Sequence, residues 1–198
     1  LGGRLDSVTA CQNSIVAFTN IDLDHQTILG KTIEEIALEK AAAITTRTQM
    51  IFSVKQHKNV QKILSKQAKF YNLPIESSNT KIKSLKLKHL HGAHQLINAQ
   101  LAYKISKTIT KNYFININVN DIINGIKTTK WPGRFHIINT NPTVVFDVAH
   151  NNAGIASFIK TLNVFFVIVH HTQLVTVALT LGLSITVIVS PTVKTPGL

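Results

Sequence analysis

Residues 20–43 read NIDLDHQTILGKTIEEIALEKAAA, and the second half of this stretch has the pattern of a helix that buries one side. Thr32 is a favourable N-cap residue, and Glu35, three positions later, completes a capping box. Apolar residues then recur at the spacing of one helix face, and they are Ile33, Ile36 and Ala37. The stretch therefore predicts a helix that begins directly after Thr32 and packs against a core.

Lys40 lies on the apolar side of this predicted helix, seven residues after Ile33. Its neighbours three and four positions away are apolar, so none of them can pair with an ammonium group. A buried charged lysine is costly unless it is neutralised or modified. One interpretation is a side chain that reaches past the edge of the helix to water. The other is a lysine with a chemical role.

The composition is that of a globular chain with excess positive charge. The 198 residues suffice for one or two domains, and 44% of them are hydrophobic. Lysine and arginine number 21 against 9 acidic residues, so the formal net charge is +12. Such a charge favours anionic partners, among them nucleotides, polycarboxylates, nucleic acids and acidic membranes. Cys11 is the single cysteine, which excludes an internal disulfide and predicts a reducing, cytoplasmic setting.

The sequence lacks two kinds of segment. It has no G-x-x-x-x-G-K-S/T phosphate loop, so a nucleotide site is expected to take that loop from upstream sequence. It opens on LGGRLD without a signal peptide, and its apolar tail carries His170, His171 and Gln173. That tail does not make a clean membrane span, so we expect no membrane partner.

Strand and helix patterns alternate in the first half of the chain. Residues 14–20 and 50–54 resemble buried parallel strands, and residues 57–71 have the pattern of an amphipathic helix. This alternation indicates an α/β fold with a parallel sheet covered by helices. Residues 81–89 alternate lysine with apolar residues and predict an exposed or edge strand. They lack the interleaved aromatic residues that favour nucleic-acid binding.

Polar residues occur at places where such a fold binds ligands. Asp24 and His25 follow the first predicted strand, and ligands bind at the carboxyl ends of strands in open α/β sheets. His94 and Asn98 are one turn apart in a helical pattern over residues 90–109, so both can face one ligand. A short helix is predicted at 121–126. Two further strands are predicted, and they are residues 135–139 and 143–146.

Several separated motifs, in order, resemble those of the folylpolyglutamate synthase and dihydrofolate synthase family of the Mur ligase superfamily. Residues 19–41 match T-x-I-x-L-D-H, L-G-x-T and E-K-A, and residues 92–102 match G-x-H-Q-x-x-N-A-x-x-A. Residues 131–134 match W-x-G-R, and residues 1–6 match the G-G-R-L-D of a further family motif. Residues 147–151 resemble D-G-A-H-N, with Val148 in place of the glycine. The resemblance covers roughly residues 1–160.

The resemblance implies a set of functional residues. His25 and a carbamylated Lys40 would hold Mg²⁺ near the reacting phosphate, since a carbamylated lysine is an anionic oxygen ligand. Asn98 would lie near adenine, Arg134 would bind phosphate and Asp147 would contact the ribose. The full set implied for ATP is His94, Asn98, Arg134, Asp147 and His150, and the candidates for the substrate side are Arg4 and Asp6.

We therefore expect an α/β chain formed by the rear of a P-loop-type ATPase domain, residues 1–132, and the start of a Rossmann-like C-terminal domain, residues 133–198, that diverges after about residue 162. The implied protein is a cytoplasmic, monomeric ligase that uses Mg²⁺ and ATP to add glutamate to folate or dihydropteroate through an acyl phosphate. It would bind no nucleic acid, and these residues alone are expected to be inactive. The alternative is a degenerate, non-catalytic basic protein that binds nucleic acid or another polyanion.

Overall fold

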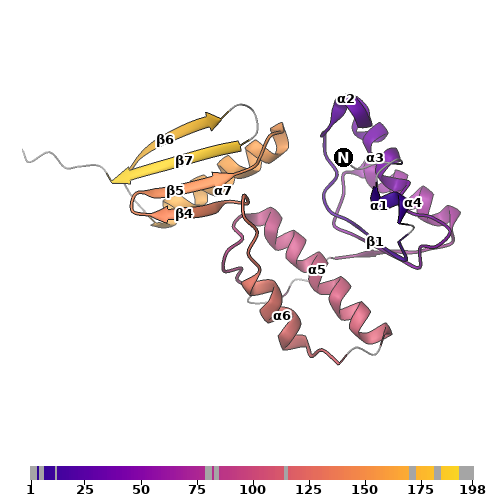
Figure 1. Cartoon of the computed structure of the whole chain (residues 1–198). Helices are drawn as coiled ribbons and strands as arrows, with labels where there is room; N and C mark the ends of the chain where they lie inside the picture. Colours follow the sequence, from indigo (N-terminus) through magenta and orange to yellow (C-terminus); the bar gives the residue numbers. More distant parts are fainter. Residues whose placement is uncertain are drawn as a thin grey trace, which may run out of the picture. The chain divides into compact units, whose positions relative to one another are not determined.

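The computed structural model describes residues 4, 7–11, 13–78, 82, 85–113, 116–169, 173–180 and 184–191, which form two compact units (Figure 1). Unit 1 comprises Leu1–Leu85 and Leu96–Ile126, and unit 2 comprises Lys86–Gln95 and Lys127–Leu198. The domain boundaries expected from the sequence, 1–132 and 133–198, stay a prediction that this division into units does not test.

A parallel sheet lies at the centre of unit 1. Its strands are β1 (Ile15–Phe18), β2 (Met50–Ser53) and β3 (Ile75–Ser77), in the order β1-β2-β3. Both neighbouring pairs are parallel. The α/β class and the first two strands are thus confirmed, and β3 is a strand that the sequence analysis missed.

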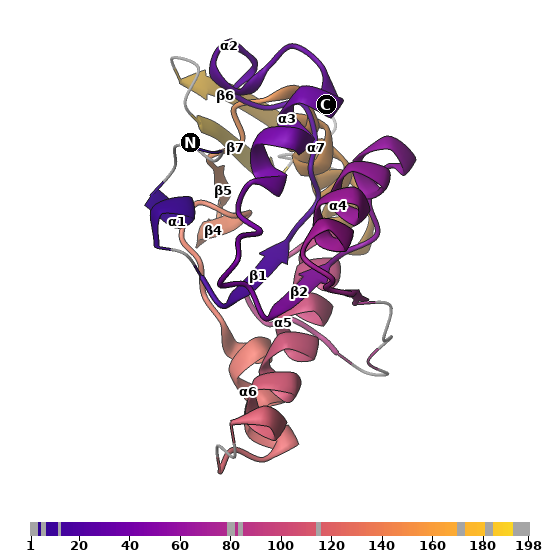
Figure 2. The same ribbon diagram turned by 90° about the vertical axis from the view of Figure 1, so that its right-hand side faces the viewer.

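Helices cover both faces of this sheet (Figure 2). One face packs against α3 (Ile33–Ala41) and α4 (Lys58–Phe70) in a core that includes Val16 and Ile51. The other face packs Phe52 against Leu101 of α5 (Ala93–Asn112). The remaining helices that carry residues of unit 1 are α1 (Ser7–Ala10), α2 (Gln26–Leu29) and α6 (Val119–Thr128).

The predicted capping box of α3 is confirmed. The backbone N–H of Glu35 donates to Thr32 Oγ1 at 3.2 Å, and Glu35 Oε2 accepts from the backbone N–H groups of Thr32 at 3.0 Å and Lys31 at 2.6 Å. The backbone hydrogen bond from Thr32, followed in size of effect by that from Lys31, holds the pKa of Glu35 below its usual value. Gly30 approaches Glu35 so closely that an added Cβ would lie 2.4 Å from Glu35 Cβ, and its φ is +126°.

Gly30→Ala should therefore destabilise unit 1. The left-handed backbone alone costs a non-glycine residue about 1–3 kcal/mol, and the contact with Glu35 adds to this cost. Gly125→Ala is the matched control, because nothing lies within 4 Å of a Cβ there. It should raise stability by about 0.5–1 kcal/mol, as alanine does in a helix. Hydrogen exchange of the α3 and α4 amides measures both changes, and equal effects of the two variants would contradict this account of Gly30.

Unit 2 contains an antiparallel sheet and one long helix. The strands are β4 (His136–Thr140), β5 (Thr143–Asp147), β6 (Gln173–Thr180) and β7 (Ser184–Pro191), in the order β4-β5-β7-β6. All neighbouring strands are antiparallel. Helix α7 (Asn152–Val169) packs on the core through Phe158 and Leu162. The predicted hairpin of two strands after residue 134 is confirmed.

One element predicted from the lysine pattern is wrong. Of residues 81–89, the structure describes 82 and 85–89, and none of these belongs to a strand. The backbone N–H of Lys88 instead donates to the carbonyl of Lys127 at 2.9 Å.

Within the described part of the chain, no helix is long and apolar enough to pass through a membrane.

Candidate functional site

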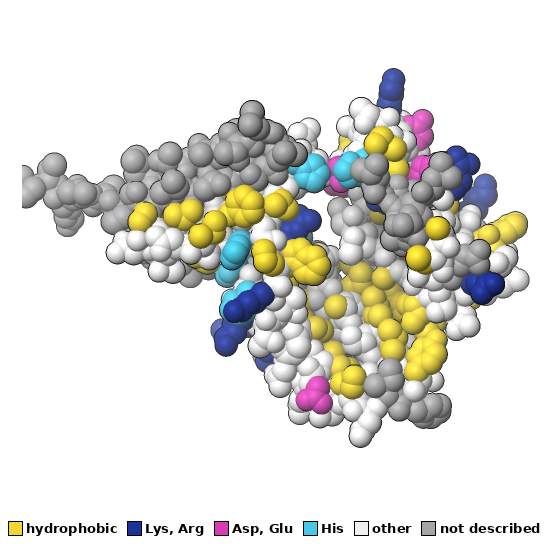
Figure 3. Space-filling view, viewed as in Figure 1, with side chains coloured by type: hydrophobic (Ala, Val, Ile, Leu, Met, Phe, Trp, Pro, Cys, Tyr) yellow, Lys and Arg dark blue, Asp and Glu magenta, His cyan; other side chains and the backbone are white. Residues whose placement is uncertain are grey.

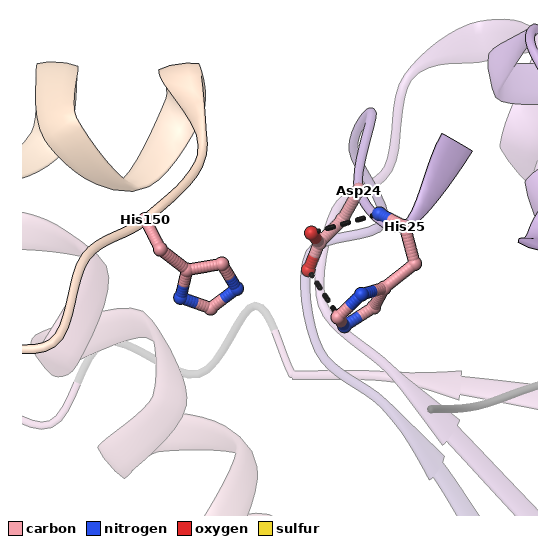
Figure 4. Close-up of side chains that lie close together, drawn as sticks. All are labelled: Asp24, His25 and His150. Carbon is pink, nitrogen blue, oxygen red and sulfur yellow. Dashed lines mark hydrogen bonds and ion pairs between the residues drawn. The ribbon is translucent and has the colours of Figure 1, made fainter. Parts of the chain in front are cut away.

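Asp24 and His25 lie on the segment that leaves the carboxyl end of β1. His25 precedes α2 and has a left-handed backbone, with φ 49° and ψ 41°. Its backbone N–H donates to Asp24 Oδ1 at 2.9 Å, and its Nε2 lies 3.6 Å from Asp24 Oδ2 (Figure 4). The two side chains are 32% and 34% exposed, so both remain accessible to a ligand.

The Asp24 carboxylate is a ligand type that fits a magnesium ion, whereas the imidazole of His25 is a ligand type more typical of transition metals. Mg²⁺ in proteins is usually bound through one or two carboxylates, and Asp24 supplies one next to the imidazole of His25. Sequence analysis placed His25 in the metal set but left Asp24 out of it. The signal was nevertheless present, because the two residues are adjacent in the matched L-D-H motif.

Lys40 lies in the last turn of α3 and is half-buried. Its neighbours Ile36, Ala37 and Ala41 are buried. Its ammonium group makes no hydrogen bond or ion pair with any residue that the structure describes. The position therefore agrees with the predicted apolar side of the helix, and the burial of the lysine is partial.

Arg4 is held beside the same turn of α3. Its backbone N–H donates to Glu39 Oε2 at 3.0 Å, and its Nη2 lies 3.8 Å from Glu39 Oε1. The Arg4 side chain is 70% exposed, so this ion pair contributes little to stability. The contact nevertheless places Arg4 next to the residue that precedes Lys40. Asp6, the other residue predicted for the substrate side, lies outside the described residues.

In unit 2, Asp147 joins the two predicted nucleotide motifs. This carboxylate is only 8% exposed, and both of its oxygens accept backbone hydrogen bonds. Oδ2 accepts from the N–H of Phe135 at 2.7 Å, and Oδ1 accepts from the N–H of Ala149 at 2.8 Å. The backbone N–H of Val148 also donates to the carbonyl of Gly133 at 2.9 Å. The turn at 131–135 and the loop at 147–150 are therefore one connected structure.

Val148, which replaces a glycine of the family motif, is accommodated by Gly133. Its backbone is not left-handed. Gly133 has φ +79°, and a Cβ added there would lie 2.8 Å from Val148 Cγ1. The absence of a side chain at position 133 thus makes room for the valine at position 148.

Arg134 stands on this turn between two buried residues, Gly133 and Phe135. Its guanidinium group is exposed and forms no hydrogen bond or ion pair within the described ranges. A fixed backbone and an unpaired guanidinium group suit the binding of a phosphate or carboxylate, which arginine can contact through two parallel hydrogen bonds.

His94 lies near this turn in the same unit. Its Nδ1 is 2.8 Å from Ser157 Oγ of α7, a partner that sequence analysis missed because the two residues are 63 positions apart. Partial burial lowers the pKa of His94, the charge of Asp147 opposes this shift and that of Arg134 adds to it. Asn98 is half-buried, four residues further along α5.

His150, also drawn in Figure 4, belongs to the loop fixed by Asp147. Its Nδ1 lies 3.0 Å from the carbonyl oxygen of Val148, and its ring is exposed. Unit 2 thus brings Arg134, Asp147 and His150 into one connected turn and loop, with the charges of Arg134 and Asp147 acting on His94.

Asp147→Asn should destabilise unit 2. An asparagine offers one acceptor oxygen, so its NH₂ group would face the backbone N–H of either Phe135 or Ala149 and leave that buried donor unsatisfied, at a cost of about 1–3 kcal/mol. Hydrogen exchange of the β5 amides and of Ala149 measures the loss. Asp121→Asn is the control, because its exposed carboxylate accepts one backbone bond that asparagine can keep. Unchanged exchange in Asp147→Asn would contradict this role.

Comparison with known proteins gives a consistent set of similarities. No protein-family model matches the chain. The chain is 29% identical over 184 residues to the dihydrofolate synthase/folylpolyglutamate synthase of Bacillus subtilis, covering 82% of this chain and 43% of that protein. It resembles an FPGS–AMPPCP–folate complex with a TM-score of 0.74 at 23% identity, covering 84% of this chain and 46% of the other.

A second solved structure gives the same result. The chain resembles Mycobacterium tuberculosis folylpolyglutamate synthase complexed with ADP, with a TM-score of 0.66 at 25% identity, covering 82% of this chain and 41% of the other. The chain therefore spans less than half the length of the proteins that it matches.

Proposed function

We propose, from the confirmed similarity of the chain to the folylpolyglutamate synthase and dihydrofolate synthase family, that the whole protein is an ATP-dependent amide ligase that adds glutamate to a folate or to dihydropteroate. The observation that carries this proposal is the pairing of Asp24 with His25 at the carboxyl end of β1, in the fold of that family. A cytoplasmic monomer remains part of the proposal.

The proposed reaction has two steps. The terminal phosphoryl group of ATP moves to a carboxylate oxygen of the folate or pteroate, and ADP leaves. The amino group of glutamate then attacks the acyl carbon, the new C–N bond forms as the C–O bond to phosphate breaks, and the amine releases a proton. Catalysis of this kind consists mainly of positioning and of neutralising charge.

In this proposal, unit 1 supplies the metal site. Asp24, His25 and a carbamylated Lys40 hold Mg²⁺, which when bound neutralises charge on the phosphate oxygens. Lys40 is suited to carbamylation because its ammonium group has no partner within the described chain and its neighbours on the helix are buried and apolar. Arg4, held by Glu39 beside Lys40, is a candidate for contact with the substrate, as Asp6 is from the family motif alone.

The turn and loop of unit 2 contact the nucleotide in this proposal. Arg134 binds phosphate oxygens through two parallel hydrogen bonds. Asp147 keeps its two backbone hydrogen bonds and approaches the ribose with its remaining acceptor capacity. His94, Asn98 and His150 complete the nucleotide contacts.

A chimera tests the proposed function. Residues 1–198 are joined to the remaining segments of the Bacillus subtilis relative, and release of ADP and phosphate is measured. We expect release that depends on both glutamate and a folate or dihydropteroate, and no turnover by residues 1–198 alone. ATP hydrolysis by the chimera that is indifferent to glutamate would contradict the ligase assignment.

The distribution of charge favours one second candidate, a non-catalytic protein that binds a polyanion. Helix α4 carries an exposed row of lysines without acidic partners among the described residues, and they are Lys58, Lys62, Lys66 and Lys69. Figure 3 shows lysine and arginine side chains, in dark blue, and acidic side chains, in magenta, on the visible face of unit 1. Tight oligonucleotide binding that weakens steeply with salt would favour this candidate over the ligase.

A further inference from the structure

Gln56 lies on the link between β2 and α4 and is only 8% exposed. Its Oε1 accepts from the backbone N–H of Ile21 at 3.1 Å. Its Nε2 donates to the backbone carbonyl of Thr19 at 2.8 Å and to Ser53 Oγ at 3.1 Å. One buried side-chain amide therefore contacts the segment that leaves β1 and the end of β2.

These contacts extend the pairing of β1 with β2 beyond the sheet. The last paired residues are Phe18 and Ser53, and the backbone N–H of Val54 then donates to the carbonyl of Phe18 at 3.0 Å. The chain turns away from β1 after this point. The amide of Gln56 offers a carbonyl and an N–H as a peptide group does, and it binds Thr19 and Ile21 where the ladder of backbone hydrogen bonds has ended.

The contacts lie directly before the candidate metal ligands. Ile21 is 4% exposed and belongs to the core of unit 1, so its N–H has little access to water. Removal of the Gln56 amide would leave this buried donor unsatisfied, which is costly, and would remove one hydrogen bond from the carbonyl of the exposed residue Thr19. The path of residues 19–25 thus depends on a side chain 35 positions away in the sequence.

We propose that Gln56 is a positioning residue that fixes residues 19–25 and so holds Asp24 and His25 in place for the metal. This inference rests on the proposed function, because it assigns Gln56 a role at the same site. Gln56 acts through the backbone of Thr19 and Ile21 and does not itself bind the metal.

The experiment compares Gln56→Met with Gln61→Met in the chain of residues 1–198. Methionine is similar in size to glutamine and forms none of the three hydrogen bonds. Gln61 lies in α4, five residues further along the chain, and its Nε2 donates to Ser65 Oγ at the surface. Hydrogen exchange is measured for residues 19–25 and for β2 and α4. The ring resonance of His25 is followed by NMR during titration with Mn²⁺.

Gln56→Met should raise the exchange rate of residues 19–25 by at least about tenfold, leave β2 and α4 within about twofold, and shift the His25 resonance. At least about tenfold more Mn²⁺ should be needed to broaden that resonance, and Gln61→Met should change none of these. Unchanged exchange at 19–25, or an equal rise throughout unit 1, would overturn the positioning role. If Mn²⁺ fails to broaden His25 in the parent chain, the metal site of the proposed function is wrong, and the exchange data still decide the role of Gln56.

Discussion

Lys40→Ala in an active chimera should lower turnover by on the order of 10²–10³-fold, because the reaction loses a group that neutralises charge on the transferred phosphate. Lys40 lies among buried apolar residues, and its ammonium group has no partner within the described chain. In the proposed function, Lys40 has reacted with carbon dioxide to form a carbamate. Its carbamate would then add anionic oxygen to the site formed by Asp24 and His25.

Lys40→Arg separates this role from that of an ordinary charged lysine. Arginine stays charged and cannot form the carbamate, so it should be as inactive as alanine if the carbamate is required. Added formate or acetate should restore part of the activity of Lys40→Ala by supplying the missing carboxylate. Lys66→Ala, at an exposed position of α4, is the control and should retain full turnover. Near-normal activity of Lys40→Arg would contradict the carbamate and would indicate that Lys40 is an ordinary charged lysine whose side chain reaches water.

The start of α3 was predictable because its determinants are local. Thr32 and Glu35 are three residues apart, and each side chain accepts a hydrogen bond from the backbone N–H of the other residue. The capping box is therefore visible directly in the sequence. Strands β1 and β2 were predictable because they are short apolar runs buried within unit 1. The fold class follows from these elements, since strands that alternate with helices favour a parallel sheet.

Strand β3 and the lysine-rich stretch show where this reasoning fails. Residues Ile75–Ser77 form only three positions of strand, none of them fully buried, and their pairing with β2 is what makes them a strand. In residues 81–89 lysine and apolar residues alternate as in an edge strand. Such alternation leads to a strand only if a neighbouring strand is available for pairing. In the described part of that stretch none is paired.

The same distinction between predictable and unpredictable features applies to the candidate site. His25 was found because it follows a strand and belongs to the matched L-D-H motif, whereas its neighbour Asp24 was left out of the metal set. The contacts of Asp147 with Phe135, of Gln56 with Ile21 and of Ser157 with His94 join residues 12, 35 and 63 positions apart. Such contacts carry no periodic signal, because they depend on how the chain is folded and not on local sequence. Ligand-binding groups were therefore easier to identify from the sequence than the groups that hold them in place.

Arg134→Lys should lower kcat/KM for ATP in the active chimera by on the order of 10²-fold, about the effect of removing one transition-state hydrogen-bond donor. The guanidinium group can bind two phosphate oxygens in one plane, whereas an ammonium group acts as a single point charge. The backbone at position 134 is fixed by the hydrogen bond from Phe135 to Asp147 and by that from Val148 to Gly133. The shorter reach of lysine is thus not corrected by movement of the turn.

The stability of the variant makes this result interpretable. The Arg134 side chain is exposed and forms no hydrogen bond or ion pair within the described chain, so Arg134→Lys should leave the thermal unfolding of unit 2 unchanged. Arg47→Lys, an exposed arginine of unit 1 just before β2, is the matched control and should retain normal kcat/KM. An Arg134→Lys enzyme with unaltered ATP dependence would show that this arginine does not contact the nucleotide, and the unpaired guanidinium group would then be only an exposed charge on a rigid turn.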